Sequence, residues 1–186
     1  MRTVKITIKG VSPIAFSKHY EVPKLPKELP GDYEERTWRN RTHTDKEGQV
    51  MVTAMMLKNM LFDVAKFLGE KIPGKGSKTY TKHFESGILV VDAAPLGVSV
   101  KDIEHEKLFV PSDGIRGSGK RVWKYFPVIH NWEAVFTVFI LDETITKDVF
   151  ERYLQEAGKF IGLGFFRPAR GGTKGRFTVA KIEWTK

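Results

Sequence analysis

The sequence predicts an α+β fold of the ferredoxin-like type, with an antiparallel sheet that carries its helices on one face. Residues 2–9 alternate strictly between apolar and polar side chains, and the segments 53–68 and 146–160 have apolar residues at helical spacing. Further strand patterns separate and follow the two helical segments. With 186 residues the chain fits one domain with a sizeable hydrophobic core.

The first strand is expected over residues 2–9, because Val4, Ile6 and Ile8 share one face and Thr and Lys residues share the other. Other apolar or alternating runs extend the sheet. They are a short extended piece at 49–53, a buried strand at 87–91, a short strand at 96–100 preceding an acidic connector at 102–106, a central strand at 134–141 apolar enough to be covered on both faces, and a last strand at 176–184.

Each of the two expected helices has one apolar stripe that can pack on the sheet. In the first helix, 53–68, the stripe consists of Leu57, Met60, Leu61, Val64 and Leu68. In the second helix, 146–160, it consists of Val149, Phe150, Tyr153, Leu154, Ala157 and Phe160.

A long polar segment, residues 17–48, is the first of two insertions expected in this single domain of residues 1–186. A loop of this length in a compact domain is usually functional or partly disordered. Tyr33 and Trp38 are candidates for stacking on nucleobases, since they lie near arginines. The alternative is that both rings anchor the segment to the core. The cationic candidates in this segment are Arg36, Arg39 and Arg41.

The second insertion, residues 111–126, combines glycines with positive charges. We expect a flexible arm or a hairpin, and a solvated loop is the alternative. Its candidate residues for binding an anion are Arg116, Lys120 and Arg121, and Trp123 is a further stacking candidate.

A third basic segment, residues 161–177, connects the second helix to the last strand and contains five glycines, four basic residues and three phenylalanines. Glycine lets a ligand approach the backbone, and arginine can hold phosphate oxygens through two parallel hydrogen bonds. The segment is therefore expected to grip a phosphate backbone. The alternative is a flexible, solvated turn whose glycines serve only its geometry. The four basic residues are Arg167, Arg170, Lys174 and Arg176.

Composition points to a nucleic-acid partner, because the formal net charge is +9 and the pI is about 9.6. The absence of cysteine excludes disulfides, thiolate zinc sites and a cysteine nucleophile. No apolar run is long enough to span a membrane, and no secretory leader is evident, so a cytoplasmic protein is expected. The five histidines form no metal-binding motif, and neither a metal nor another cofactor is expected.

Two stretches of the chain resemble the RAMP superfamily of CRISPR-associated RNA-binding proteins. Gly162–Gly164, then Arg167, then Gly172–Phe177 are similar to that family's glycine-rich loop, which follows a helix near the end of an RRM-like domain. Residues 50–61 are similar to the segment that opens the first long helix of the repeating backbone subunits. This second match departs from the family at Asn59, which stands in place of a glycine, and in the Val-Thr-Ala that replaces a Pro-Gly-Ser lead.

The resemblance implies binding of single-stranded RNA or DNA along the sugar-phosphate backbone, by a homo-oligomer or by a subunit of a larger ribonucleoprotein. Similar proteins also occur as small stand-alone products of phage-type genomes. Basic glycine-bearing loops on a sheet lead to the same expectation: charge sets the affinity, aromatic rings stack on bases, and nothing points to base-specific recognition.

Two other functions compete with this one. Some RAMP proteins cleave RNA without a metal through a loop histidine, and His19 and His43 are the candidates here, with Lys46 or Arg41 to stabilise developing charge. The other possibility is an interaction or inhibitor protein that binds an acidic protein surface.

Overall fold

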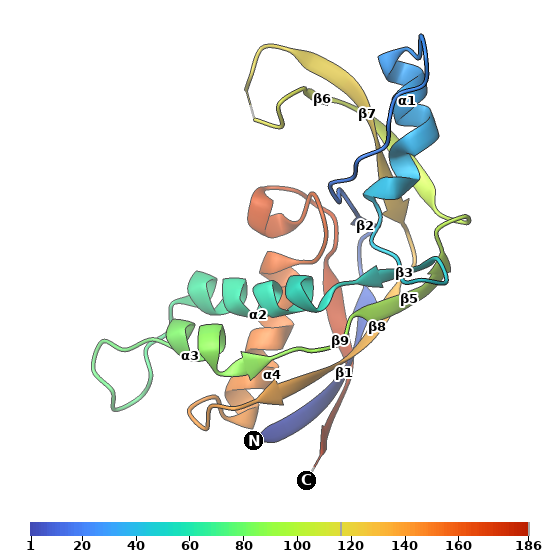
Figure 1. The fold of residues 1–186 in the computed structure, drawn as a ribbon. Coiled ribbons are helices and arrows are strands. Elements are labelled where there is room, and N and C mark those ends of the chain that lie inside the picture. Colours follow the sequence, from blue (N-terminus) through green and yellow to red (C-terminus); the bar gives the residue numbers. More distant parts are fainter. Residues whose placement is uncertain (116, 186) are drawn as a thin grey trace.

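The computed structural model describes residues 1–115 and 117–185 and confirms the α+β, ferredoxin-like prediction (Figure 1). The main sheet has the strand order β4-β8-β1-β9, and every neighbouring pair is antiparallel. Its strands are β1 (Arg2–Gly10), β4 (Ile88–Leu89), β8 (Glu133–Ile140) and β9 (Phe177–Thr185). One long helix lies between β1 and β4 and another between β8 and β9, which gives two split β-α-β units.

The two long helices are α2 (Ala54–Leu68) and α4 (Lys147–Glu156). The side chain of Thr53 accepts a hydrogen bond from the backbone N–H of Met56 and so caps the start of α2. Gly69 ends α2 in the left-handed conformation, with φ of 57°. After α4 the chain continues in a π-helical turn, η2 (Ala157–Ile161), so the second helix is shorter than predicted and its last residues are wound differently.

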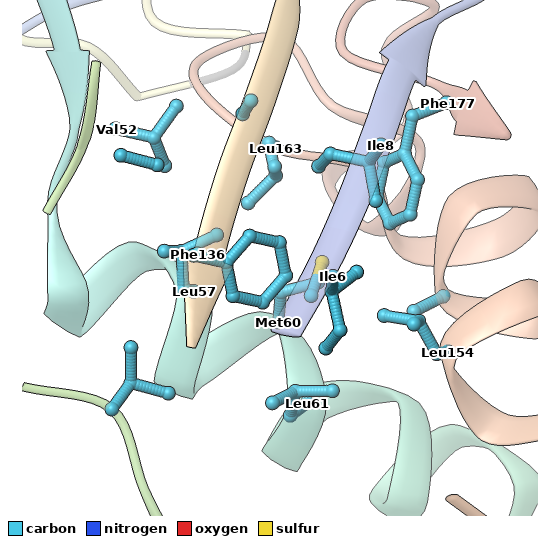
Figure 2. Packing of buried hydrophobic residues seen from close by; sticks show 14 of the residues in the cluster. Ile6, Ile8, Val52, Leu57, Met60, Leu61, Phe136, Leu154, Leu163 and Phe177 are labelled. Carbon is cyan, nitrogen blue, oxygen red and sulfur yellow. The ribbon is translucent and has the colours of Figure 1, made fainter. Parts of the chain in front are cut away.

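The core lies between the sheet and these helices (Figure 2). Ile6 and Ile8 of β1 and Phe136 of β8 pack near Leu57 and Met60 of α2, and all five side chains are at most 3% exposed. Full burial of such a side chain contributes about 1.5–3 kcal/mol. The main sheet is therefore a firm platform for the segments at its edge.

Most of the remaining elements gather at one end of this platform (Figure 1). A second sheet has the order β2-β7-β6, with β2 (Ile14–Ala15), β6 (Glu104–Pro111) and β7 (Arg121–Ile129). Segment 17–48 contains α1 (Pro30–Thr37) and the 3₁₀ turn η1 (Trp38–Arg41). Strand β3 (Gln49–Val52) pairs with β5 (Ala94–Ser99), and the 3₁₀ turn η3 is formed by Pro168–Arg170. The short helix α3 (Thr81–Ser86) lies elsewhere, beside α2 and β4 (Figure 1).

Three details of the predicted secondary structure were wrong. Residues 102–106 are not simply a connector, because β6 begins at Glu104 and pairs along its length with β7 in a long hairpin. Strand β8 is covered on one face only: Ala134 and Val138 are buried, whereas Val135 on the opposite face is 39% exposed. The strand predicted at 87–91 is limited to the two residues of β4, which pair with the end of β8.

Candidate nucleic-acid interface

The β6–β7 hairpin separates two groups of predicted site residues, because successive residues of a strand point to opposite faces. Its odd-numbered residues, such as the paired Phe109 and Trp123, form one face, and the base of this face contacts η1. Its even-numbered residues, such as the paired Glu106 and Phe126, form the other face, which contacts residues 162–176, the glycine loop. We call the odd-numbered side the ladder face and the even-numbered side the loop face.

The glycine loop is packed against its own backbone. A Cβ on Gly172 would lie 1.8 Å from the carbonyl oxygen of Phe166, and a Cβ on Gly175 would lie 1.8 Å from that of Leu163. Gly175 also has φ of 75°, where glycine is favoured. Its N–H donates to the carbonyl oxygen of Pro13, and its own carbonyl oxygen accepts from the N–H of Leu163. The glycines therefore serve the geometry of a packed loop, which is not the solvated turn that the sequence left open.

Three of the four basic residues in the glycine loop are bound to other protein groups. An Arg167 guanidinium nitrogen lies 2.9 Å from a carboxylate oxygen of Asp63 in α2, and Lys174 Nζ lies 2.5 Å from Glu106 in β6. Arg176 donates to the carbonyl oxygen of Lys159. In this conformation each of the three side chains makes one hydrogen bond within the fold. Arg170 is exposed and has no ion pair within the described part of the chain.

Two of the three arginines of segment 17–48 are also paired. Arg41 donates two hydrogen bonds of 2.8 Å to the carboxylate of Glu34, and Arg36 donates to both oxygens of Glu28. The hydrogen bonds from Arg36 lower the pKa of the Glu28 carboxyl to about 2. These two ion pairs connect parts of segment 17–48 to each other. The buried side chain of Arg41 also lies beside Tyr20 of the segment and Phe126 of β7, and so fixes the segment on β7.

The predicted stacking residue Trp38 is only 3% exposed and does not offer an open ring face. Its ring lies 4.7 Å from that of His105 in β6, so it anchors the segment to the hairpin, as the alternative interpretation held. Tyr33 is partly exposed and donates a hydrogen bond to the carbonyl oxygen of Val22, while the charged groups of Lys24 and Arg36 lie 5.7 Å from its ring centre. Its ring is therefore already engaged by local cations.

A continuous row of rings and cations runs along the ladder face. From the base, Arg39 lies 4.3 Å above Trp38, and His105 lies between Trp38 and Tyr125 at 4.7 and 4.8 Å. Lys107 lies 5.2 Å from the Tyr125 ring. We call the whole row the aromatic–cation ladder; its members are Arg39, Trp38, His105, Tyr125, Lys107, Trp123, Phe109 and Arg121.

The outer half of the ladder is open to solvent. Phe109 and Trp123 pair across the hairpin with ring centres 5.1 Å apart, and they are 47% and 54% exposed. Lys107 lies 5.6 Å from the Trp123 ring, and Arg121 lies 5.5 Å from the Phe109 ring. Arg121 also donates to the carbonyl oxygen of Phe109, which leaves the rest of its guanidinium exposed. Two large rings flanked by cations form a surface on which planar groups can stack.

Two other residues were predicted in this segment. Lys120, directly before β7, is exposed and has no ion pair within the described residues. Arg116 lies outside the described residues.

Sequence reasoning found four ladder members and missed the other four, which are His105, Lys107 and Phe109 in β6 and Tyr125 in β7. The signal was present as an alternation with a period of two, since the three in β6 all have odd numbers. It was overlooked because residues 102–106 were taken for a connector. The hairpin pairing that brings Phe109 to Trp123 could then not be seen.

The two histidines proposed for RNA cleavage lie in unlike surroundings. His19 has an 89% exposed side chain, and its only ion-pair partner among the described residues is Glu21 at 3.7 Å. His43 packs edge-on against Phe16, and burial lowers the pKa of its imidazole. His19 nevertheless lines a pocket of about 200 Å³ together with Lys18 and Arg41, the arginine proposed above to stabilise developing charge. The nuclease alternative therefore stays a prediction.

The described residues contain no group of three or more His, Asp or Glu side chains arranged to hold a metal ion. Among them, no helix combines the length and apolar character needed to cross a membrane.

No family model and no curated protein sequence matches the chain. Among solved structures, the fold is similar to that of a chain in the cryo-EM structure of the Type III-B Cmr-beta bound to cognate target RNA, with a TM-score of 0.58 and 15% sequence identity. The match covers 100% of this chain and 61% of the other, so this chain spans less than two thirds of its neighbour's length. At this level of identity the likeness shows a common fold.

Proposed function

We propose that this chain binds single-stranded nucleic acid, with the bases stacked on the ladder face of the β6–β7 hairpin and the phosphates held by the cations beside it. The observation that carries the proposal is the exposed pair of Phe109 and Trp123, flanked by Lys107 and Arg121. Stacking of a base on an aromatic ring contributes about 1–3 kcal/mol and tolerates any base. Duplex bases are already stacked on each other, so a single strand is the better ligand.

The charge distribution supports the same function. The formal net charge of +9 attracts a polyanion over the whole molecule. On and beside the outer half of the ladder, Lys107, Lys120 and Arg121 form no ion pair with a carboxylate of a described residue. A cation without an ion-pair partner can neutralise a phosphate without first breaking an ion pair. Such contacts make the affinity fall steeply as the salt concentration rises.

We also propose that the chain is a RAMP-like protein that acts as a homo-oligomer or within a larger ribonucleoprotein. Support comes from the glycine-loop motif, the ferredoxin-like strand order, and the likeness to a chain of an RNA-bound Type III-B Cmr-beta. RNA is accordingly the first ligand to test, and single-stranded DNA the second.

The test is a fluorescence-anisotropy titration of the purified protein with labelled single-stranded RNA, single-stranded DNA and duplex at two salt concentrations. Replacing both Phe109 and Trp123 by alanine should weaken single-strand binding at least about fivefold, while thermal unfolding stays unchanged because both rings are exposed. Phe67→Ala is the matched control, since Phe67 is 58% exposed but lies on α2 outside the ladder.

Binding that is equally tight in the double variant would overturn the role of the ladder. Absence of binding to any strand at low salt would overturn the function itself and direct attention to an acidic protein partner. A probe found cleaved after the titration would favour the nuclease alternative.

A further inference from the structure

At the base of the ladder lies an open groove of about 540 Å³ whose lining carries two carboxylates beside one guanidinium. It is lined by Glu35, Trp38, Arg39, Ile103, Glu104 and His105. Its volume is within the range of sites that hold small planar ligands. The row of stacked rings leads directly into it, because His105 and Trp38 are members of both.

The carboxylates make this groove unsuited to a phosphate. Glu35 forms no ion pair with any described residue, and Glu104 lies 3.3 Å from the exposed ring of His130. Two negative charges against one arginine repel a phosphate oxygen. A neutral group that donates hydrogen bonds to a carboxylate is favoured instead. Within a single-stranded nucleic acid, such donors are the edges of the bases and, in RNA, the 2′-hydroxyl groups. Of these, only a base edge can also offer acceptors to an arginine beside the carboxylate contact.

Guanine is the base whose two edges match both the carboxylates and the guanidinium of the groove. Its Watson–Crick edge carries two adjacent donors, N1–H and the N2 amine, which one carboxylate can accept together. Its O6 and N7 are acceptors that an arginine can bind with two hydrogen bonds. Uracil offers a single N3–H between two carbonyl oxygens, and those oxygens repel a carboxylate. Adenine and cytosine each offer one amine donor.

We infer that this groove binds a guanine base, with Glu35 or Glu104 on its Watson–Crick edge and Arg39 on its O6 and N7, at the end of the row of rings where His105 lines the groove. The inference rests on the proposed single-strand binding and sharpens it: the ladder binds any base, and the groove at its base selects one. The protein then has a preferred register on a strand that contains guanine.

The test compares an all-uridine RNA decamer with decamers in which one central uridine is replaced by guanosine, inosine, adenosine or cytidine. One guanosine should tighten binding about tenfold, because a bidentate contact is worth roughly that factor in discrimination. Inosine lacks the N2 amine and should lose most of the gain. A 7-deazaguanosine decamer should lose the part that depends on Arg39.

Glu35→Gln and Glu104→Gln, singly and together, identify the carboxylate. The responsible substitution should reduce the guanosine preference to about twofold or less, and it should raise affinity for the all-uridine decamer because a negative charge is removed. Glu143→Gln, in the turn between β8 and α4 away from the hairpin, is the control with the same charge change and should alter neither affinity. Equal affinity for all five decamers overturns the inference and leaves the binding function standing. No binding of any decamer overturns both.

Discussion

The glycine loop and the β6–β7 hairpin turn are alike in composition but opposite in structure. Both combine several glycines with arginines and lysines. In the glycine loop, a Cβ at Gly172 or Gly175 would collide with the backbone of the same loop. In the hairpin turn, a Cβ at Gly114 would meet no described atom within 4 Å, although this glycine has φ of 76°.

The cations of the two regions differ in the same way. Lys174 of the glycine loop is bound to Glu106, whereas Lys107, the next residue along β6 from that glutamate, lies over two aromatic rings on the opposite face. The comparison shows that a basic glycine-rich stretch has two uses. It can lock a loop onto its own domain, or it can extend a charged surface into solvent. Which of these applies depends on whether carboxylates and backbone lie within reach in the folded chain.

The largest difference between the two regions is expected in the free energy of unfolding when a glycine is replaced by alanine. Gly175→Ala forces a close contact with the Leu163 carbonyl oxygen at a left-handed position and should lower the free energy of unfolding by about 2–5 kcal/mol. Gly114→Ala meets only the left-handed strain and should cost about 1–2 kcal/mol. Urea denaturation monitored by circular dichroism measures both. Equal costs would mean that the glycine loop is as open as the hairpin turn.

Replacing one lysine in each region tests which of the two positive charges is available to a phosphate. Lys107→Met should weaken RNA binding a few fold and lower the slope of log affinity against log salt by about 1, because a phosphate contact is lost. Lys174→Met should leave that slope unchanged and cost up to about 1 kcal/mol of stability through the lost ion pair, whose groups are partly exposed. Anisotropy at four salt concentrations gives both slopes. A lower slope for Lys174→Met alone would assign the phosphate contact to the glycine loop.

The smallest effect concerns whether the ion pair between Arg36 and Glu28 stays intact when RNA is added. Because its hydrogen bonds lower the pKa of Glu28 to about 2, the ion pair is fully formed above about pH 4.5 and is lost as the pH falls toward 2. Carboxyl NMR shifts should show Glu28 titrating near pH 2, and in Arg36→Ala its pKa should return toward 4.5. Added single-stranded RNA should not move this titration. A shift on adding RNA would show that Arg36 leaves Glu28 for a phosphate.

Much of the fold could be predicted from local pattern. The alternation of Val4, Ile6 and Ile8 marked β1, and the spacing of Leu57, Met60 and Leu61 marked α2 within one residue of its start. The hairpin was only partly predicted, since its register depends on pairing between residues far apart in sequence. The alternation of β8 was hidden by apolar side chains on its exposed face.

The sequence by itself determined the ferredoxin-like order of elements and the basic character of the protein, because both follow from side-chain periodicity and composition. Only the tertiary structure decided which cations and rings are available. Arg167 meets Asp63 across 104 positions, and Lys174 meets Glu106 across 68. Trp38 is buried against His105, while Phe109 and Trp123 remain exposed. Availability depends on distances through space between residues distant in the chain, and local pattern contains no information on those distances.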